Sequence, residues 1–313
     1  MKKVLFRSDA SPKIGAGHLM RSVALAQSLH DKGAQVLFMT VPSFDELNRY
    51  LRSQSFAVRF MNMSSEHAGS KVDLQGVLEE VQQGYDWVVL DNYYFTTEFQ
   101  KAVQAASSSV VFINDHEDNS PAADIYVNVS LPEYALIRSE LRRMPKKESR
   151  GARSVLVTLG GSRQTETLSK IIRALKTLDD FDFHIKVVCG FEHETFSEEG
   201  GRHRLEFCPA SIENYKLYAW ADLAVAAAGG TVWELNYFQI PAVVGALSER
   251  QAAFGEALSQ AGACEYVGWY SRASEESIAK AVRLAARKKP AALVDGKGAE
   301  RIIERMKAVP KNV

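Results

Sequence analysis

Short apolar runs rich in β-branched residues alternate with longer amphipathic stretches along this chain, and that alternation constrains its fold more than any other feature. Strands buried on both faces read as continuous apolar runs, and helical crossovers between them make a sheet parallel. After the first run, Leu19, Val23 and Ala26 recur at helical spacing and predict a helix that ends before Lys32-Gly33. We therefore expect an α/β fold. Its predicted strands are Val4–Phe6, Val36–Met39, Val58–Phe60, Trp87–Leu90, Val110–Ile113, Ile125–Val129, Val155–Val157, Ile185–Val188, Leu205–Phe207, Leu223–Ala226 and Ala242–Val244.

A polar and strongly basic segment, Arg142–Arg150, separates two such series of strands. Because 313 residues exceed the usual size of one domain, we place a boundary in this segment. Residues 1–149 are predicted to form an N-terminal Rossmann-like lobe, and residues 150–313 a second Rossmann-like lobe that includes the C-terminal helices. The basic run itself is typical of a solvated linker, so we assign it no ligand.

The composition excludes several classes of function. Lys plus Arg equals Asp plus Glu, at 38 each, so no net charge attracts nucleic acid or an anionic membrane. The cysteines Cys189, Cys208 and Cys264 form no CxxC pair, which argues against a disulfide framework and a zinc site. No run of about 18 apolar residues, the length a membrane span needs, occurs. These features predict a cytoplasmic protein without stable membrane insertion.

The loop after the first predicted strand carries the best candidate for chemistry. Gly15 and Gly17 let a backbone approach a ligand closely, and His18 falls in the first turn of the following helix. The positive end of the helix dipole disfavours imidazolium there, which leaves a neutral ring able to accept a proton. Arg21 is predicted either to pair with Asp9 or to face a phosphate. The alternative is structural, with His18 capping the helix and Asp9 and Arg21 forming an ion pair.

Polar residues also follow two later strands of the first lobe. Asp91 ends a buried run, so its carboxylate is expected at the ligand-binding edge of the sheet, and Tyr93 and Tyr94 offer rings and hydroxyls to a sugar. Packing between helix and sheet explains one of these tyrosines equally well. His116 lies in a similar position after the next strand, where a solvated histidine is the more common outcome.

In the second lobe, the turn Gly160-Gly161-Ser162 precedes a helix and resembles a backbone nest for phosphate. Glycines at such a turn also serve tight packing.

A second turn of small residues is more informative. A strand runs into Gly229-Gly230-Thr231, where free N–H groups and a hydroxyl are suited to a pyrophosphate. Glu234 lies one turn further, at a distance suited to both hydroxyls of a ribose, and Gln251 opens a later helix where it reaches toward the sugar. Glu234 as a partner of the helix dipole at the surface is the alternative.

These segments together resemble a known family. The stretch from Tyr218 to Gln251 is similar to the nucleotide-binding half of the GT-B superfamily, which includes the MurG glycosyltransferases. Arg7-Ser8-Asp9 through Gly15-Ala16-Gly17-His18-Leu19-Met20-Arg21 narrows the resemblance to the PseG family of UDP-sugar hydrolases and its SpsG relatives of spore coat polysaccharide biosynthesis. Further matches are Asp91-Asn92-Tyr93, Tyr134–Arg138, Gly160-Gly161 and Val294–Arg301.

The resemblance implies a GT-B fold, in which two Rossmann-like lobes with parallel sheets face a cleft. It implies that His18 is the general base for a water that attacks the anomeric carbon and releases UDP, that Tyr93 lies near the sugar, and that neither metal nor cofactor takes part. Asp91 and Tyr93 are the further catalytic candidates. Gly229, Gly230, Thr231 and Glu234 match the UDP-binding loop. Two positions depart from the hydrolase pattern: Arg163-Gln164 replaces an acidic residue, and the phosphate loop reads Ala-Gly-Gly-Thr.

Three functions fit these observations. The first is a hydrolase similar to UDP-2,4-diacetamido-2,4,6-trideoxy-β-L-altropyranose hydrolase, in pseudaminic (nonulosonic) acid or spore coat polysaccharide biosynthesis. The second is a glycosyltransferase with a UDP-sugar donor, in which His18 deprotonates an acceptor hydroxyl. The third is a non-catalytic nucleotide-sugar-binding subunit. In each the UDP-sugar is the partner, and contact with other polysaccharide biosynthesis enzymes is an additional expectation.

Overall fold

The computed structural model describes residues 2–11, 14–107, 109–115, 122–146, 151–160, 164–189 and 201–310. The chain divides into two compact units. The first comprises Met1–Arg142 with Gly296–Val313, and the second comprises Arg143–Asp295.

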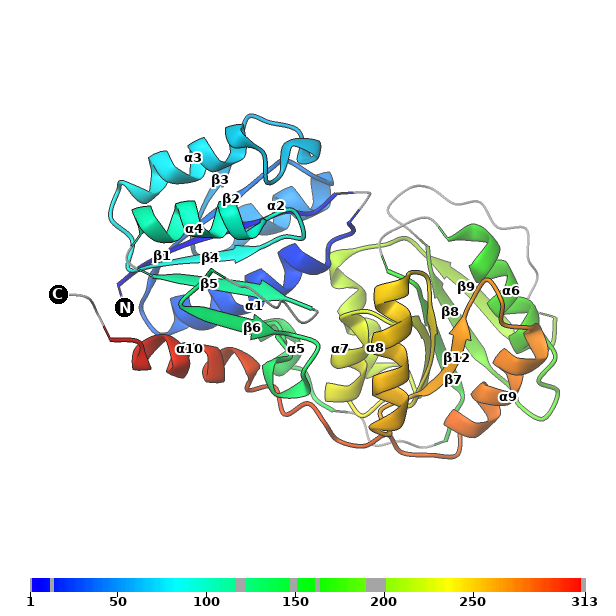
Figure 1. Ribbon diagram of the computed structural model, residues 1–313. Coiled ribbons are helices and arrows are strands. Elements are labelled where there is room, and N and C mark those ends of the chain that lie inside the picture. The colour runs from blue at the N-terminus through cyan, green and yellow to red at the C-terminus, as the bar shows by residue number, and fades with distance from the viewer. Residues whose placement is uncertain are drawn as a thin grey trace. The chain divides into compact units, whose positions relative to one another are not determined.

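The first unit contains a six-stranded sheet in the order β3-β2-β1-β4-β5-β6 (Figure 1). Every neighbouring pair of strands is parallel, as the alternation of strands and helices predicts. The strands are β1 (Lys3–Ser8), β2 (Gln35–Thr40), β3 (Ala57–Phe60), β4 (Trp87–Asp91), β5 (Val110–Asn114) and β6 (Ile125–Asn128). The helices are α1 (Gly17–Asp31), α2 (Asp45–Ser53), α3 (Lys71–Val81), α4 (Thr97–Ala106), α5 (Ser139–Arg142) and α10 (Gly298–Ala308), with short 3-10 turns η1 (Ser65–His67) and η2 (Pro132–Tyr134).

Helices cover both faces of this sheet. Figure 1 shows α3 and α4 on one face and α1 and α10 on the other. Every residue of β4 and β5 is buried, which explains why these segments read as unbroken apolar runs. Leu19, Val23 and Ala26 of α1 are fully buried, so the helical spacing seen in the sequence is the face that packs on the sheet.

The second unit contains another six-stranded sheet, in the order β12-β11-β10-β7-β8-β9, again with parallel neighbours. The strands are β7 (Ser154–Thr158), β8 (His184–Val188), β9 (Arg204–Cys208), β10 (Leu223–Ala227), β11 (Ala242–Ala246) and β12 (Glu265–Trp269). The other elements are α6 (Thr165–Lys176), η3 (Ile212–Ala219), α7 (Thr231–Tyr237), α8 (Glu249–Gln260) and α9 (Glu275–Ala285).

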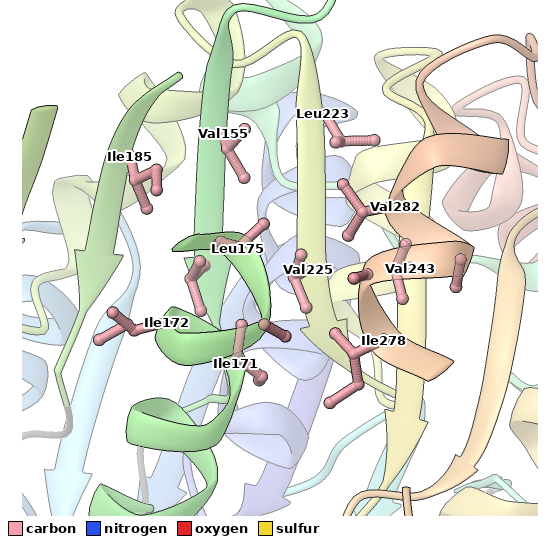
Figure 2. Packing of buried hydrophobic residues seen from close by; sticks show 14 of the residues in the cluster. Val155, Ile171, Ile172, Leu175, Ile185, Leu223, Val225, Val243, Ile278 and Val282 are labelled. Atoms are coloured by element: carbon pink, nitrogen blue, oxygen red, sulfur yellow. The ribbon is translucent and has the colours of Figure 1, made fainter. Parts of the chain in front are cut away.

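One hydrophobic core of the second unit lies between its sheet and the helices α6 and α9. Figure 2 shows Ile171 and Leu175 of α6 and Ile278 of α9 directed at strand residues such as Val155 and Val225. These side chains are all fully buried. Burial of the apolar stripes of α6 and α9 therefore stabilises the packing of these helices on the sheet.

Two features differ from the sequence prediction. Strand β12 was not foreseen, because its residues are only half-buried and its pairing with β11 is irregular. The helix α10, which we had assigned to the second lobe, packs in the first unit against η2, α1 and β6. The helix is amphipathic, and its buried face includes Ile302, Ile303 and Met306. Amphipathicity does not specify which of two sheets a helix covers.

Some glycines of the second unit are required by packing and others are not. A Cβ placed on Gly245 of β11 would lie 2.6 Å from the ring of Tyr270, which is fully buried and donates its hydroxyl to the carbonyl of Ala226 at 2.8 Å. By contrast, a Cβ on Gly229 or Gly230 would meet no atom within 4 Å. Gly230 also has an ordinary helical backbone, with φ −54° and ψ −27°.

This contrast predicts opposite effects of the same substitution. Gly245→Ala should destabilise the protein by about 1–3 kcal/mol, because the ring of Tyr270 must shift in a packed core. Gly230→Ala should leave the free energy of unfolding unchanged or raise it by about 0.4–1 kcal/mol, because alanine restricts the unfolded chain. Urea denaturation of both variants measures the difference. Equal destabilisation by the two substitutions would contradict this account of the packing.

Candidate functional site

In the first unit, the carboxyl ends of β1 and β4 lie side by side, with Ser8 in register with Asp91. Ligands bind at this edge of open parallel sheets. The chain leaves β1, turns at Gly15 and enters α1 at Gly17, so that the first turn of α1 lies above the end of β4. This topology brings His18 to Asp91, which is 73 residues away in the sequence.

The pair of His18 and Asp91 is the centre of the site. Nδ1 of His18 lies 2.6 Å from Oδ1 of Asp91, and both residues are buried, at 3% and 0% exposure. Nη2 of Arg21 also lies 3.0 Å from Nδ1, but the contact with Asp91 is shorter, and an ionised carboxylate only accepts hydrogen bonds. This geometry assigns the proton to Nδ1, so that Nε2 of the neutral ring keeps its lone pair. Nε2 is buried and has no hydrogen-bond partner among the described residues. A histidine oriented in this way is suited to accept a proton at Nε2.

Asp91 is held by two further groups of α1. Arg21 donates from Nε to Oδ2 at 2.8 Å and from Nη2 to Oδ1 at 2.6 Å, and the hydroxyl of Ser22 donates to Oδ2 at 2.8 Å. Burial of Asp91 opposes its ionisation, but the charge of Arg21 and the hydrogen bonds from Arg21 and His18 outweigh that effect and lower the pKa of Asp91 to about 2. The carboxylate is therefore charged throughout the physiological range.

The predicted pair of Asp9 and Arg21 does not form. Asp9 accepts instead from Nη1 of Arg7 at 2.5 Å, from the backbone N–H of Val41 at 2.9 Å and from Nδ2 of Asn92 at 3.1 Å. Asp9 is fully buried, and these bonds favour a structural role for it. Sequence spacing did not distinguish Asp9 from Asp91 as the partner of Arg21, because the choice depends on strand order.

Tyr93 packs against His18, and its hydroxyl reaches Asp115. The rings of Tyr93 and His18 meet edge to face, with centroids 4.2 Å apart. The hydroxyl donates to Oδ2 of Asp115 at 2.5 Å, and Nη1 of Arg21 lies 3.3 Å from the same oxygen. Burial opposes ionisation of Asp115, but Arg21 and this hydrogen bond lower its pKa.

The sequence prediction missed Ser22 as a member of the site, and in the loop after β5 it singled out His116 in place of Asp115. The signal for Asp115 was its place after β5, next to β4 in the sheet. His116, which the sequence singled out there, lies outside the described residues.

The glycine turn before α1 has two different glycines. Gly15 has a φ of +70°, which favours glycine, and its backbone pairs with that of Ser11. Gly17 is exposed, its φ is not positive, and a Cβ there would meet no atom within 4 Å. No side chain caps α1, and its first turn contains no acidic residue. The positive end of the α1 dipole is therefore not offset by a carboxylate of its own first turn.

In the second unit, the predicted nucleotide loop joins β10 to α7. Gly229 is half-buried and Gly230 is exposed, and neither packing nor backbone strain requires glycine at these positions. Thr231 is the first residue of α7, and Glu234 in the same helix accepts a hydrogen bond of 2.6 Å from the hydroxyl of Tyr218. The arrangement leaves an open backbone surface in front of a short helix.

The remaining candidates of the second unit are the glycine turn after β7 and Gln251. Gly160 lies two residues after β7 and has a φ of +93°, whereas Gly161, Ser162 and Arg163 are not described. Oε1 of Gln251 accepts from the backbone N–H of Leu247 at 2.9 Å, so this side chain fixes its own loop.

Two absences hold for the whole described part of the chain. Within it, no three His, Cys, Asp or Glu side chains gather as a metal ion would need. Among the same residues, no helix is both long and apolar enough to cross a bilayer.

Comparison with known proteins finds a matching family model and similar curated proteins. Residues 155–308 match the model of the glycosyltransferase family 28 C-terminal domain. The uncharacterised protein MJ1062 of Methanocaldococcus jannaschii is 22% identical over 77% of this chain and 55% of its own length. The UDP-2,4-diacetamido-2,4,6-trideoxy-β-L-altropyranose hydrolase of Campylobacter jejuni is 24% identical over 51% of this chain and 61% of its own length. The chain thus spans little more than half of the curated relatives it matches.

A solved structure establishes the fold class. MurG of Acinetobacter baumannii superposes with a TM-score of 0.63 at 18% identity, over 99% of this chain and 100% of that protein. Together with the two parallel six-stranded sheets, this similarity confirms the predicted GT-B fold.

The low pKa of Asp91 predicts a defined pH dependence. Because the pKa is lower in the folded protein than in the unfolded chain, the stabilisation is present above about pH 4 and is lost as the pH falls toward 2. The free-energy difference between the wild type and Asp91→Asn should therefore shrink by about 2 kcal/mol between pH 5 and pH 2. Urea denaturation at several pH values measures it, with Asp179→Asn, whose side chain is 90% exposed, as the control. A difference that does not change with pH would contradict the assignment of Asp91 as a buried carboxylate.

Proposed function

We propose that this protein hydrolyses a UDP-linked deoxyamino sugar, with His18 as the general base. The observation that carries the proposal is the buried pair of His18 and Asp91, which leaves Nε2 of His18 as the basic atom. The match to a glycosyltransferase domain and the 24% identity to a UDP-sugar hydrolase support a nucleotide sugar as the substrate.

In the proposed step, Nε2 of His18 removes a proton from a water molecule. The water oxygen forms a bond to the anomeric carbon while the bond from that carbon to the β-phosphate oxygen breaks, so the electron pair leaves with UDP and the anomeric centre inverts. The ionised Asp91 stabilises the imidazolium that forms and keeps the ring oriented. Tyr93 limits the movement of the His18 ring through their edge-to-face contact.

The second unit supplies the proposed nucleotide contacts. The backbone of Gly229 and Gly230 and the hydroxyl of Thr231 are suited to the diphosphate, and the carboxylate of Glu234 to the ribose hydroxyls. The absence of any packing reason for the two glycines supports this role, because a ligand that approaches the backbone does require them. Gly160 and Gly161 are proposed as a further backbone contact, and Gly15 and Gly17 as the contact of the first unit.

Glycosyl transfer is the second candidate, and the match of residues 155–308 to a glycosyltransferase domain favours it. The donor contacts would be the same, and His18 would deprotonate an acceptor hydroxyl in place of water. A non-catalytic subunit would bind UDP without turnover. A cytoplasmic location and a place in pseudaminic acid or spore coat polysaccharide biosynthesis stay predictions.

Incubation with UDP-sugars in ¹⁸O-labelled water, with and without an acceptor, tests the proposal. Mass spectrometry should find the heavy oxygen in the free sugar if water attacks carbon. Label in the phosphate would show attack at phosphorus, and UDP release that requires an acceptor would show glycosyl transfer. Binding without release under any condition would favour the subunit.

Substitution of the base should separate chemistry from binding. His18→Ala is expected to lower kcat by about 10²–10⁴-fold, because a positioned general base contributes that much, and to leave the affinity for UDP unchanged. Steady-state kinetics and calorimetry measure the two effects, with the exposed His67→Ala as the control. A variant that keeps full activity would exclude His18 as the base.

Substitution in the loop between β10 and α7 should affect the binding of UDP. Gly230→Ala is expected to weaken UDP binding about tenfold, since a Cβ would occupy the space above the backbone, while the thermal stability does not fall. Calorimetric titration with UDP and a thermal melt of the same sample provide both values. Unchanged affinity would remove Gly230 from the proposed binding loop.

A further inference from the structure

Glu234 of the second unit is held by a residue to which no role has been assigned. Tyr218 lies in η3, 16 residues before Glu234, and its hydroxyl donates to Oε2 of Glu234 at 2.6 Å. Hydrogen bonds from a hydroxyl to a carboxylate at this distance are among the stronger ones in proteins. The bond links η3 to α7 and fixes the carboxylate relative to the loop before α7.

Tyr218 is itself fixed in place. The residue is 7% exposed, and the centroid of its ring lies 5.7 Å from that of Phe238, which is 4% exposed and follows the last residue of α7. A ring enclosed in this way has little freedom to rotate, so its hydroxyl has a defined position. The donor is thus as well ordered as the acceptor it orients.

We propose that Tyr218 is a positioning residue that presets the carboxylate of Glu234 for the ribose of the nucleotide; this inference rests on the function proposed above. A carboxylate has acceptor sites for about four hydrogen bonds, the bond from Tyr218 uses one of them, and a ribose presents two adjacent hydroxyl donors. Presetting reduces the rotamer entropy that Glu234 loses on binding. Tyr218 therefore favours ribonucleotide donors over 2′-deoxyribonucleotide donors.

A different result is expected if the bond between Tyr218 and Glu234 only holds η3 to α7. Its loss would change the stability, or the affinity for all nucleotides equally. Loss of a positioning bond would lower the affinity for a nucleotide that carries the 2′-hydroxyl more than the affinity for one that lacks it. The ratio of two affinities thus distinguishes the roles.

The experiment compares UDP with 2′-deoxyuridine diphosphate by calorimetric titration of the full chain. The wild type should prefer UDP by about tenfold, as one hydrogen bond to a carboxylate provides. Tyr218→Phe keeps the ring and removes only the hydroxyl, and it should reduce the preference to about threefold or less. Tyr237→Phe is the matched control, because its ring also contacts Phe238, with centroids 5.3 Å apart, and it should keep the wild-type preference. In a Glu234→Gln background, Tyr218→Phe should have no further effect on the ratio.

The outcomes are distinguishable. If the wild type binds UDP but Tyr218→Phe keeps its preference, or loses affinity for both ligands equally, Tyr218 is structural and the inference fails while the proposed function stands. If the wild type binds neither ligand, the proposed function and the inference fail together. Thermal melts of each variant separate any loss of folded protein from loss of affinity.

Discussion

Three side chains of α1 converge on the carboxylate of Asp91, and the geometry of the first unit's site depends on that convergence. His18, Arg21 and Ser22 occupy the first turns of the helix and all bond the same group at the end of β4. A buried charge is tolerated only when it is paired and fully hydrogen-bonded, and removal of one partner from such a pair typically costs about 3–5 kcal/mol. The requirement to satisfy Asp91 thus fixes both where α1 begins and how it is rotated about its axis.

The same network separates two roles that look alike in the sequence. Asp9 directly follows β1 and Asp91 is the last residue of β4, and both are fully buried. Asp9 is enclosed by Arg7 and by backbone and amide donors, whereas Asp91 bonds a histidine whose other nitrogen has no partner among the described residues. A buried polar atom without a partner is unfavourable in a resting protein, which is why such atoms concentrate where a ligand completes the bonding.

The sequence predicted the strands well because a strand buried on both faces leaves an apolar run that local pattern detects. It also predicted His18 and Asp91 separately, from a helix start and a strand end. It did not predict that they touch, because this depends on β4 lying beside β1, and strand order is a property of the whole sheet. For the same reason the sequence did not identify Asp91 as the partner of Arg21, for which it offered Asp9 or a phosphate. Strand β12 and the bond between Tyr218 and Glu234 escaped prediction because a half-buried strand and a short 3-10 segment carry little periodic signal.

The placement of α10 has a consequence for how the protein is made. The first unit consists of two pieces of chain, and the second unit is synthesised between them. Gly298 at the start of α10 fits directly against the carbonyl of Ala135, and Arg142 bonds Glu300 at 3.0 Å, so these contacts join residues that leave the ribosome far apart in time. Domains usually fold in the order of synthesis. Here the second unit is synthesised completely before α10, which the first unit needs to cover part of its sheet. Until α10 emerges, that part of the first unit is accessible to chaperones and proteases.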